Sequence, residues 1–411
     1  MSTLHQKQKH YLHNAFVPYP YVHNEMVPEL NGIGGMAVFA SSDSSTRRQM
    51  FTTQLGQSLD IEYADEAFMQ TGIERKFGEA TFAVRAPANM RVIKVVPFYQ
   101  KDAIFQGIRY NSTNYVLYED NDTGKIGIVT LPEYASFHPY FGFPYKQMSG
   151  VELKRGGYIA KDTRILDTAN VWEDGTYCFG KNVNVAFLSH PAIAEDGFIM
   201  SESARKLFPY YTYEHRVVSF GASDFALNLY GDDTYYKPCP DIGEKIRKDG
   251  LLMALRSYDD ALAGCEQSRL STRIVDPISD EGIWSDAGEG VVVDIQVLHD
   301  DCAGLPGIPI GMEQQFLKYH EGRKKFYQEI MTTVAEIRKN NRGKISLTPE
   351  LQGLLVDATA YLHQSDGRQK VRLTYAQKPL DDWQIHFTIR YKHYPGIGNK
   401  LSDLHGKFLL F

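Results

Sequence analysis

The stretch Trp383-Gln-Ile-His-Phe-Thr-Ile-Arg-Tyr-Lys392 is followed, three residues later, by Gly396-Ile-Gly-Asn-Lys-Leu-Ser-Asp-Leu-His-Gly-Lys407. The first part alternates apolar with polar residues, which predicts a β-strand. Glycines interrupt the second part, which therefore cannot form one continuous helix. It carries two lysines and a histidine within eight residues, Lys400, His405 and Lys407. Such a loop brings cations and closely approaching backbone together, which suits a phosphate group.

Bulk composition describes an ordinary globular protein. The chain has 411 residues, of which 43% are hydrophobic and 23% charged, enough for about two or three domains with their own cores. The net charge is −6, from 44 basic and 50 acidic residues. Any contact with nucleic acid must therefore come from local basic clusters or from basic partner subunits.

Targeting and redox signals point to an intracellular protein. No apolar run reaches the length of a membrane span, and the polar N-terminus is not a signal peptide. The cysteines lie far apart and form no Cys-x-x-Cys pair, which argues against a zinc ribbon and against a disulfide framework. They are Cys178, Cys239, Cys265 and Cys302.

Residue patterns predict a β-rich α+β protein. Residues 1–30 carry prolines among aromatic residues and histidines, and we expect an extended arm there. Residues 81–130 alternate like strands, with a hairpin turn at Asn121–Gly124. Helices are predicted for residues 41–59, which open with Ser and Asp as capping candidates, from near Ser201, for 311–344, and for 348–363 with Pro349 at an early helical position. Further strands are predicted for 151–160, 182–188 and 290–298.

Three segments carry short motifs of interest: Asn182–Glu202, Glu152–Ala160 and Gly396–Lys407. They resemble elements of the second-largest (β) subunit of multisubunit RNA polymerases. Asn182–Glu202 is similar to the family segment Asn-Val-x-Val-Ala-Phe followed by Glu-Asp and then Ser-Glu. Glu152–Ala160 resembles the family's Val-x-x-Gly-Asp-x-Leu-Ala element, and Gly396–Lys407 its Gly-Asp-Lys…Arg-His-Gly-Asn-Lys-Gly signature. The last match departs from the family, because Asn399 replaces the usual Asp and Lys407 directly follows Gly406.

Three more segments resemble elements of the same family. Ser45–Gln57 resembles the fork region with its Asn-Arg-x-x-Met…Gln, and Thr71–Glu74 resembles the fork's Thr-Gly-x-Glu. Gly288–Val297 fits the family's flap strand, Gly-x-Val-x-x-Val. The matches run in family order from about Gly32 to Lys407, nearly the whole chain, and this collinear order carries the assignment.

The resemblance implies a fold and its division along the chain. We expect a double-psi β-barrel built from residues 81–208 and 383–411. A flap-like insertion with a helical arm, its helices near 311–363, would interrupt the barrel over residues 209–382. Residues 1–80 would form an N-terminal arm and a fork-like region. We also expect a β subunit divided among several chains, as in large bacteriophages, because the chain stops inside the lysine loop.

The resemblance also implies roles for the loop residues. Lys400 and Lys407 would face the incoming nucleotide and the RNA 3′ end, with His405 nearby. The alternative is a solvated basic loop, which spacing alone favours and which the collinear matches make less attractive. Positive charge around a triphosphate is what phosphoryl transfer mainly requires of a protein.

Further contacts concern nucleic acid and metal. Arg47, Arg48 and Gln57 would contact an RNA–DNA hybrid, and the alternative for the arginines is a surface pair. Glu195 and Asp196 could help to hold a second Mg²⁺ through water, or could simply be an acidic pair at a helix start. The resemblance implies that the primary Mg²⁺ is held by an Asp-x-Asp-x-Asp motif on a β′-like partner subunit. The acidic pair in Leu229-Tyr-Gly-Asp-Asp-Thr234 has turn-like flanks and predicts a turn.

Together these features predict a fragment of a DNA-directed RNA polymerase, a nucleotidyltransferase subunit that is inactive alone. Its partners would be a β′-like chain, the remaining β fragments, template DNA, RNA and NTPs, with no membrane. We expect it in the host cell cytoplasm or packaged in a virion. Two alternatives stay open: a virion structural protein with an inactive polymerase-like fold, and a regulatory nucleic-acid-binding module that binds DNA in a salt-sensitive way.

Overall fold

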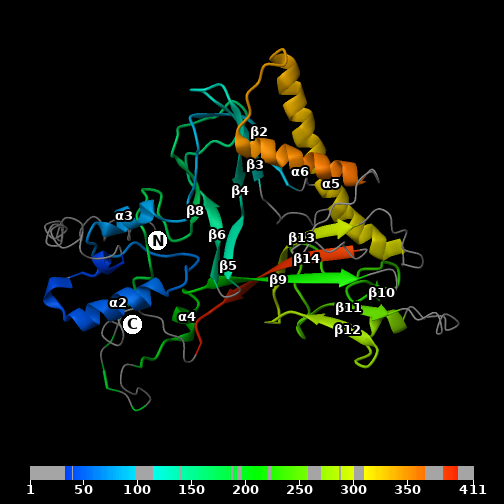
Figure 1. The fold of residues 1–411 in the computed structure, drawn as a ribbon. Coiled ribbons are helices and arrows are strands. Elements are labelled where there is room, and N and C mark those ends of the chain that lie inside the picture. The colour runs from blue at the N-terminus through cyan, green and yellow to red at the C-terminus, as the bar shows by residue number, and fades with distance from the viewer. Residues whose placement is uncertain are drawn as a thin grey trace.

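The computed structural model shows a β-rich α+β protein built from curled antiparallel sheets and few helices (Figure 1). The predicted β-rich α+β class is therefore confirmed. The residues that the structure describes are 33–38, 40–98, 114–138, 141–184, 186, 188–189, 191, 197–220, 224–257, 270–286, 288–299, 310–365 and 383–396.

A central sheet is formed by β9 (Tyr210–Phe220), β13 (Val291–His299) and β14 (Trp383–His393), with β14 in the middle. The predicted strand at 383–392 is thus confirmed, and it pairs with β9 along its whole length. Alternate β14 residues such as Ile385 and Phe387 are buried in the main apolar core. The period of two seen in the sequence therefore marks a strand with one face in that core.

A second sheet has the order β4-β3-β2-β7. Its strands are β2 (Met90–Pro97), β3 (Asn114–Asp120), β4 (Ile126–Leu131) and β7 (Tyr158–Ile159). The turn between β3 and β4 lies at the predicted hairpin, where Gly124 has a φ of +68°. Glycine suits this turn because it adopts a positive φ without the steric cost of a Cβ atom.

A third sheet, β1-β8-β6-β5, joins the second to the central one. It contains β1 (Val84–Arg85), β5 (Tyr134–His138), β6 (Phe141–Gln147) and β8 (Arg164–Thr168). Strands β5 and β6 lie against β9, where the rings of Tyr134 and Tyr213 stack with centroids 4.5 Å apart. A Cβ at Gly142 would lie 2.5 Å from the Tyr213 ring, so this close approach requires glycine.

A fourth sheet, β10-β11-β12, completes the main core. Its strands are β10 (Asp224–Ala226), β11 (Leu251–Ser257) and β12 (Asp280–Trp284). Strands β9 and β13 come from the stretch 209–382, for which we expect an insertion, yet they share the central sheet with β14.

Two long helices pack on these sheets. Helix α5 (Ile310–Asn340) contacts β13, β2 and α6 (Pro349–Ser365), and α6 contacts β4. Phe326, Ile330 and Val334 recur at helical spacing on α5 and are buried against the second sheet. The predicted helices at 311–344 and 348–363 are therefore confirmed, including Pro349 at the first helical position.

The shorter helices lie near the ends of strands. Ser44 caps α2 (Ser45–Gly56) and Ser201 caps α4 (Glu202–Arg205), so both predicted helix starts are confirmed. The remaining helical elements are α3 (Ile73–Glu79) and the 3₁₀ turns η2 (Gly34–Met36), η3 (Ala40–Ser42) and η5 (Ser271–Arg273). No helix in the described part of the chain has both the length and the apolar character that crossing a membrane requires.

Two strand predictions need correction. In the stretch 151–160 only β7 is a strand, because the preceding residues form a turn in which Gly157 donates to the Lys154 carbonyl. The described residues of the predicted strand 182–188 form no strand. The amide and side chain of Asn182 bond instead to Asp65 and to the Glu66 carbonyl. Side-chain bonds of this kind compete with the ladder of a sheet.

Candidate functional site

The C-terminal end of β14, from which the predicted lysine loop continues, meets two distant segments. Figure 1 shows the strand running toward α4. Lys392 Nζ lies 2.6 Å from Glu62 Oε2, and Arg205 of α4 donates to the Pro395 carbonyl at 3.4 Å. The Glu62 amide donates to the Pro209 carbonyl at 2.9 Å. The segment after α2, α4 and the end of β14 thus form one site.

We call the exposed part of this site the Glu62 surface. It consists of Glu62, Tyr63, Arg205, Tyr211, Lys392 and Tyr394. Burial alone would raise the pKa of the Glu62 carboxyl. Hydrogen bonds from Lys392, Tyr211 and Tyr63 outweigh that effect, so the pKa lies below its ordinary value. Glu62 therefore stays ionised and holds Lys392 beside it.

Cations lie over the rings of this surface. Lys392 Nζ is 5.5 Å from the Tyr211 ring centroid and 6.0 Å from that of Tyr394. The guanidinium of Arg205 is 5.7 Å from the Tyr394 centroid, and that of Arg390 is 5.2 Å from the Tyr211 centroid. Such contacts hold charged and aromatic side chains in a fixed array while leaving them partly open to solvent.

The next segment of the site begins with Asn182. Lys181 Nζ lies 2.9 Å from Asp65 Oδ1, and the Asn182 amide donates to Asp65 Oδ2 at 3.1 Å. The Asp65 amide donates in turn to the Gly180 carbonyl at 2.7 Å. The start of the family-like segment 182–202 is thus attached three residues after Glu62. Sequence spacing gives no sign of this, because more than a hundred residues separate the partners.

The fork-like residues form a folded unit beside it. The buried Glu74 carboxylate accepts the amides of Thr71 and Gly72 at 3.2 and 2.8 Å, and Gly72 has a φ of +87°. Burial raises the pKa of Glu74 despite these bonds. Apolar side chains of α2, α3 and the 177–179 stretch pack together above this turn, among them Phe51, Leu55, Ile73, Tyr177 and Phe179. The Thr-Gly-x-Glu pattern is therefore a helix-start motif in this chain.

The predicted nucleic-acid contacts are spread along α2. Arg47 is exposed in the first turn, with its Nη1 3.5 Å from Met50 Sδ. Gln57 is exposed at the C-terminal cap of the helix. Ten helical residues place them about 15 Å apart, so the structure does not bring them together. Arg48 is half-buried, and its Nε has no hydrogen-bond partner among the described residues.

The predicted catalytic and metal residues cannot be placed. Lys400, His405, Lys407, Glu195 and Asp196 all lie outside the described residues. Within the described ranges, no three His, Cys, Asp or Glu side chains form a group that could hold a metal ion.

The Asp232-Asp233 pair forms the turn that was predicted. Asp232 Oδ1 accepts the amides of Thr234 and Tyr235 at 2.7 and 2.8 Å. Asp233 pairs with Arg273 at 2.8 Å. Carboxylates engaged in this way serve the turn itself.

A half-buried carboxyl, Asp60, lies two residues before Glu62 in the chain. Asp60 accepts a hydrogen bond from Asn170 Nδ2 at 2.9 Å. Burial, and next the charge of Asp167, raise the pKa of Asp60 to about 6. Asp167 is itself buried on β8, where Thr81 Oγ1 and the Thr168 amide donate to it at 3.0 and 2.8 Å. Asp60 is therefore a carboxyl that takes up a proton near neutral pH.

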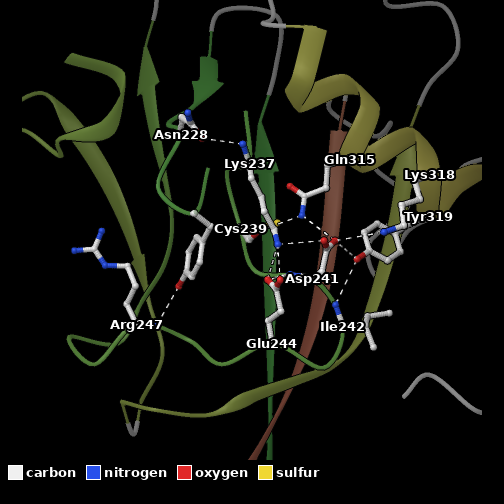
Figure 2. Close-up of polar contacts among 11 residues, drawn as sticks. Asn228, Lys237, Cys239, Asp241, Ile242, Glu244, Arg247, Gln315, Lys318 and Tyr319 are labelled. Carbon is white, nitrogen blue, oxygen red and sulfur yellow. Dashed lines mark hydrogen bonds and ion pairs between the residues drawn. The ribbon is translucent and has the colours of Figure 1, made fainter. Parts of the chain in front are cut away.

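A second polar cluster, absent from the sequence predictions, lies where the loop between β10 and β11 meets α5. Figure 2 shows Lys237 pointing between two carboxylates. Its Nζ lies 2.7 and 2.6 Å from the two Glu244 oxygens and 3.2 Å from Asp241 Oδ2. Its amide donates to Asn228 Oδ1 at 2.8 Å. We call this group, with its partners on α5, the Lys237 cluster.

Helix α5 closes the Lys237 cluster from the other side. Tyr319 Oη and Gln315 Nε2 donate to Asp241 Oδ1 at 2.6 and 3.1 Å (Figure 2). Burial would raise the pKa of Asp241, but the bond from Tyr319 and the charges of Lys318 and Lys237 outweigh it and lower that pKa. Each charge has a partner, so the cluster fixes α5 to the loop. Burial raises the pKa of the enclosed Cys239 thiol, which is therefore unreactive.

Comparison with protein families and curated proteins identifies no relative of this chain. No protein-family model matches the chain, and no curated protein matches it at a significant level.

Proposed function

We propose that the chain carries part of the β-type subunit of a multisubunit DNA-directed RNA polymerase. Its role would be to supply the cationic side of the site that joins NTPs to the RNA 3′ end. The collinear resemblance supports this proposal. So does one observation: the segment after the fork-like α2, the start of the segment 182–202 and the end of β14 lie together. In a polymerase these segments would surround one active site.

The finer fold belongs to the same proposal. The central sheet, with β14 between β9 and β13, would be part of a double-psi β-barrel. The sheet β10-β11-β12 and helices α5 and α6 would belong to the flap-like insertion and its helical arm.

The proposed chemistry is phosphoryl transfer by charge and position. Lys400 and Lys407 would lie beside the triphosphate and the reacting oxygens, with His405 near them. Lysine suits this task because its ammonium is a compact cation on a flexible stem. Stabilising the charge that develops in the transition state is then the main contribution of these residues.

Most of the metal ligands of the assembled enzyme would be supplied by partner chains. The Mg²⁺ that supplies the metal chemistry would be held by the aspartates of a β′-like chain, with Glu195 and Asp196 helping a second ion through water. Template DNA, RNA and the remaining β fragments would complete the assembly. The motifs of this chain diverge from those of the family, which favours a large bacteriophage as the source. The expected location is therefore the host cytoplasm or the virion.

The proposal is tested by replacing Lys400 in the assembled enzyme. We expect Lys400→Ala to lower the rate of RNA extension about 100-fold, because loss of one charge-stabilising group in an active site costs roughly that much. Lys154→Ala is the matched control, since Lys154 is an exposed lysine whose Nζ lies 2.7 Å from Glu152. Full transcription by the Lys400→Ala enzyme would contradict the proposal and favour a structural role in the virion.

A further inference from the structure

The Glu62 surface differs in charge from the chain as a whole. The chain carries a net charge of −6. The surface and its immediate neighbours hold four cations, Arg205, Lys206, Arg390 and Lys392, and the carboxylates Glu62 and Glu202. Two further carboxylates lie close by in the chain: Asp65 is paired with Lys181, and Asp60 accepts a hydrogen bond from Asn170. Lys392 pairs with Glu62 and Arg205 with Glu202, at 2.6 and 2.7 Å. Among the described residues, Lys206 and Arg390 form no ion pair with a carboxylate, so the exposed part of this patch carries more cations than carboxylates in an acidic protein.

Two tyrosine rings of the same surface are open to solvent. Tyr63 is 64% exposed and Tyr394 is 38% exposed. The ring of Tyr394 is held by the cations of Arg205 and Lys392 near it, and Tyr63 directly follows Glu62, whose carboxylate is bonded to Lys392. A ring that is already positioned loses little conformational entropy when a flat group stacks on it.

We infer that the Glu62 surface binds single-stranded nucleic acid. Tyr63 and Tyr394 stack on bases, and the cations beside them, among them Arg205 and Lys392, contact phosphates. Aromatic platforms combined with cations that follow the backbone are the usual means of holding a single strand without reading its sequence. The inference rests on the proposed function only in naming RNA as the natural strand.

The shape of the surface favours a single strand over a duplex. Reading the major groove needs a helix or a two-stranded ribbon that enters it. The helix on this surface, α4, has only four residues, and the tyrosines can reach bases only when these are unstacked. A protein partner is the competing occupant, but the local excess of positive charge on an acidic chain favours phosphates.

The test is fluorescence anisotropy of a short labelled oligouridylate titrated with the full chain. Tyr63→Ala and Tyr394→Ala should each weaken binding about fivefold or more, the equivalent of one lost stacking contact. Tyr394→Trp should retain the affinity, because a larger ring stacks at least as well. Lys392→Gln should reduce the slope of log affinity against log salt by about 0.7, the value for one phosphate contact on a single strand.

The matched control is Tyr158→Ala, because Tyr158 is 60% exposed but lies on β7 in a different sheet. The inference is overturned if wild-type chain does not bind the oligonucleotide, or if the Tyr63 and Tyr394 variants bind like wild type. It is also overturned if Tyr158→Ala causes the same loss. The assay contains neither NTP nor partner subunits, so its failure leaves the Lys400 test of the polymerase proposal unaffected.

Discussion

The Lys237 cluster and the Glu62 surface are built from the same kinds of side chain. Each combines a lysine paired with a carboxylate and at least one tyrosine nearby. In the first, Lys237 is 8% exposed and Tyr319 only 1%. In the second, Tyr63 and Tyr394 are open to solvent and cations outnumber carboxylates. The residue types are shared, and the difference lies in burial and in how completely the charges are matched.

That difference separates a structural site from a binding site. In the mostly buried Lys237 cluster every charge has an opposite charge beside it, and removing one member leaves another charge without its partner. An exposed array with surplus charge contributes little to stability and can exchange water for a ligand. The two regions should therefore respond in opposite ways when their lysines are replaced.

Lys237→Ala should have the largest effect on stability. It leaves Asp241 and Glu244 without their central cation in a mostly buried site. We expect a loss of about 2–3 kcal/mol in the free energy of unfolding, at the lower end for a broken buried pair because Glu244 is half-exposed. Urea unfolding measures the loss, and hydrogen exchange of the α5 amides locates it. An unchanged unfolding midpoint would show that the Lys237 cluster does not stabilise the fold.

Asp60 and Asp241 are half-buried carboxyls with opposite pKa shifts. Asp241 has cations beside it and a lowered pKa, whereas Asp60 faces Asp167 and has a pKa of about 6. The folded state then binds a proton more tightly than the unfolded chain, so stability increases as the pH falls from 7.5 to 5. The expected gain is about 1 kcal/mol.

The control for this pH effect is Asp60→Asn, which cannot titrate. Hydrogen exchange of the α2 amides should slow on acidification in the wild type more than in the variant. The same pH dependence in both proteins would show that Asp60 is not the responsible group.

Lys392→Gln should have the smallest effect on stability. The Lys392–Glu62 pair is partly exposed and screened by solvent, so its loss should cost less than about 0.5 kcal/mol. Urea unfolding beside Lys237→Ala gives the direct comparison. A loss as large as that of Lys237→Ala would mean that the Glu62 surface is a structural cluster too.

Local signals in the sequence predicted much of the fold. Ser44 and Ser201 cap helices as expected, Pro349 opens α6, and Asn121–Gly124 closes a hairpin. Each of these features depends on residues a few positions apart, and such effects are visible in sequence spacing.

Long-range contacts were not predictable in the same way. Glu62 and Lys392 are 330 residues apart, and Asp241 and Tyr319 are 78 apart. Nothing in the spacing marks either pair. The segment 182–188 was misjudged because its apolar alternation suggested a strand, while Asn182 is bonded to Asp65 and Glu66 from a distant segment. The tertiary context decided the outcome there.

The most direct test of the polymerase proposal is to identify the proteins that co-purify with the tagged chain from its source cells. The proposal predicts a stable complex that contains a chain with an Asp-x-Asp-x-Asp motif and transcribes DNA, whereas the isolated chain does not. Recovery of the chain without any such partner, or extension of a primed template by the chain alone, would contradict it.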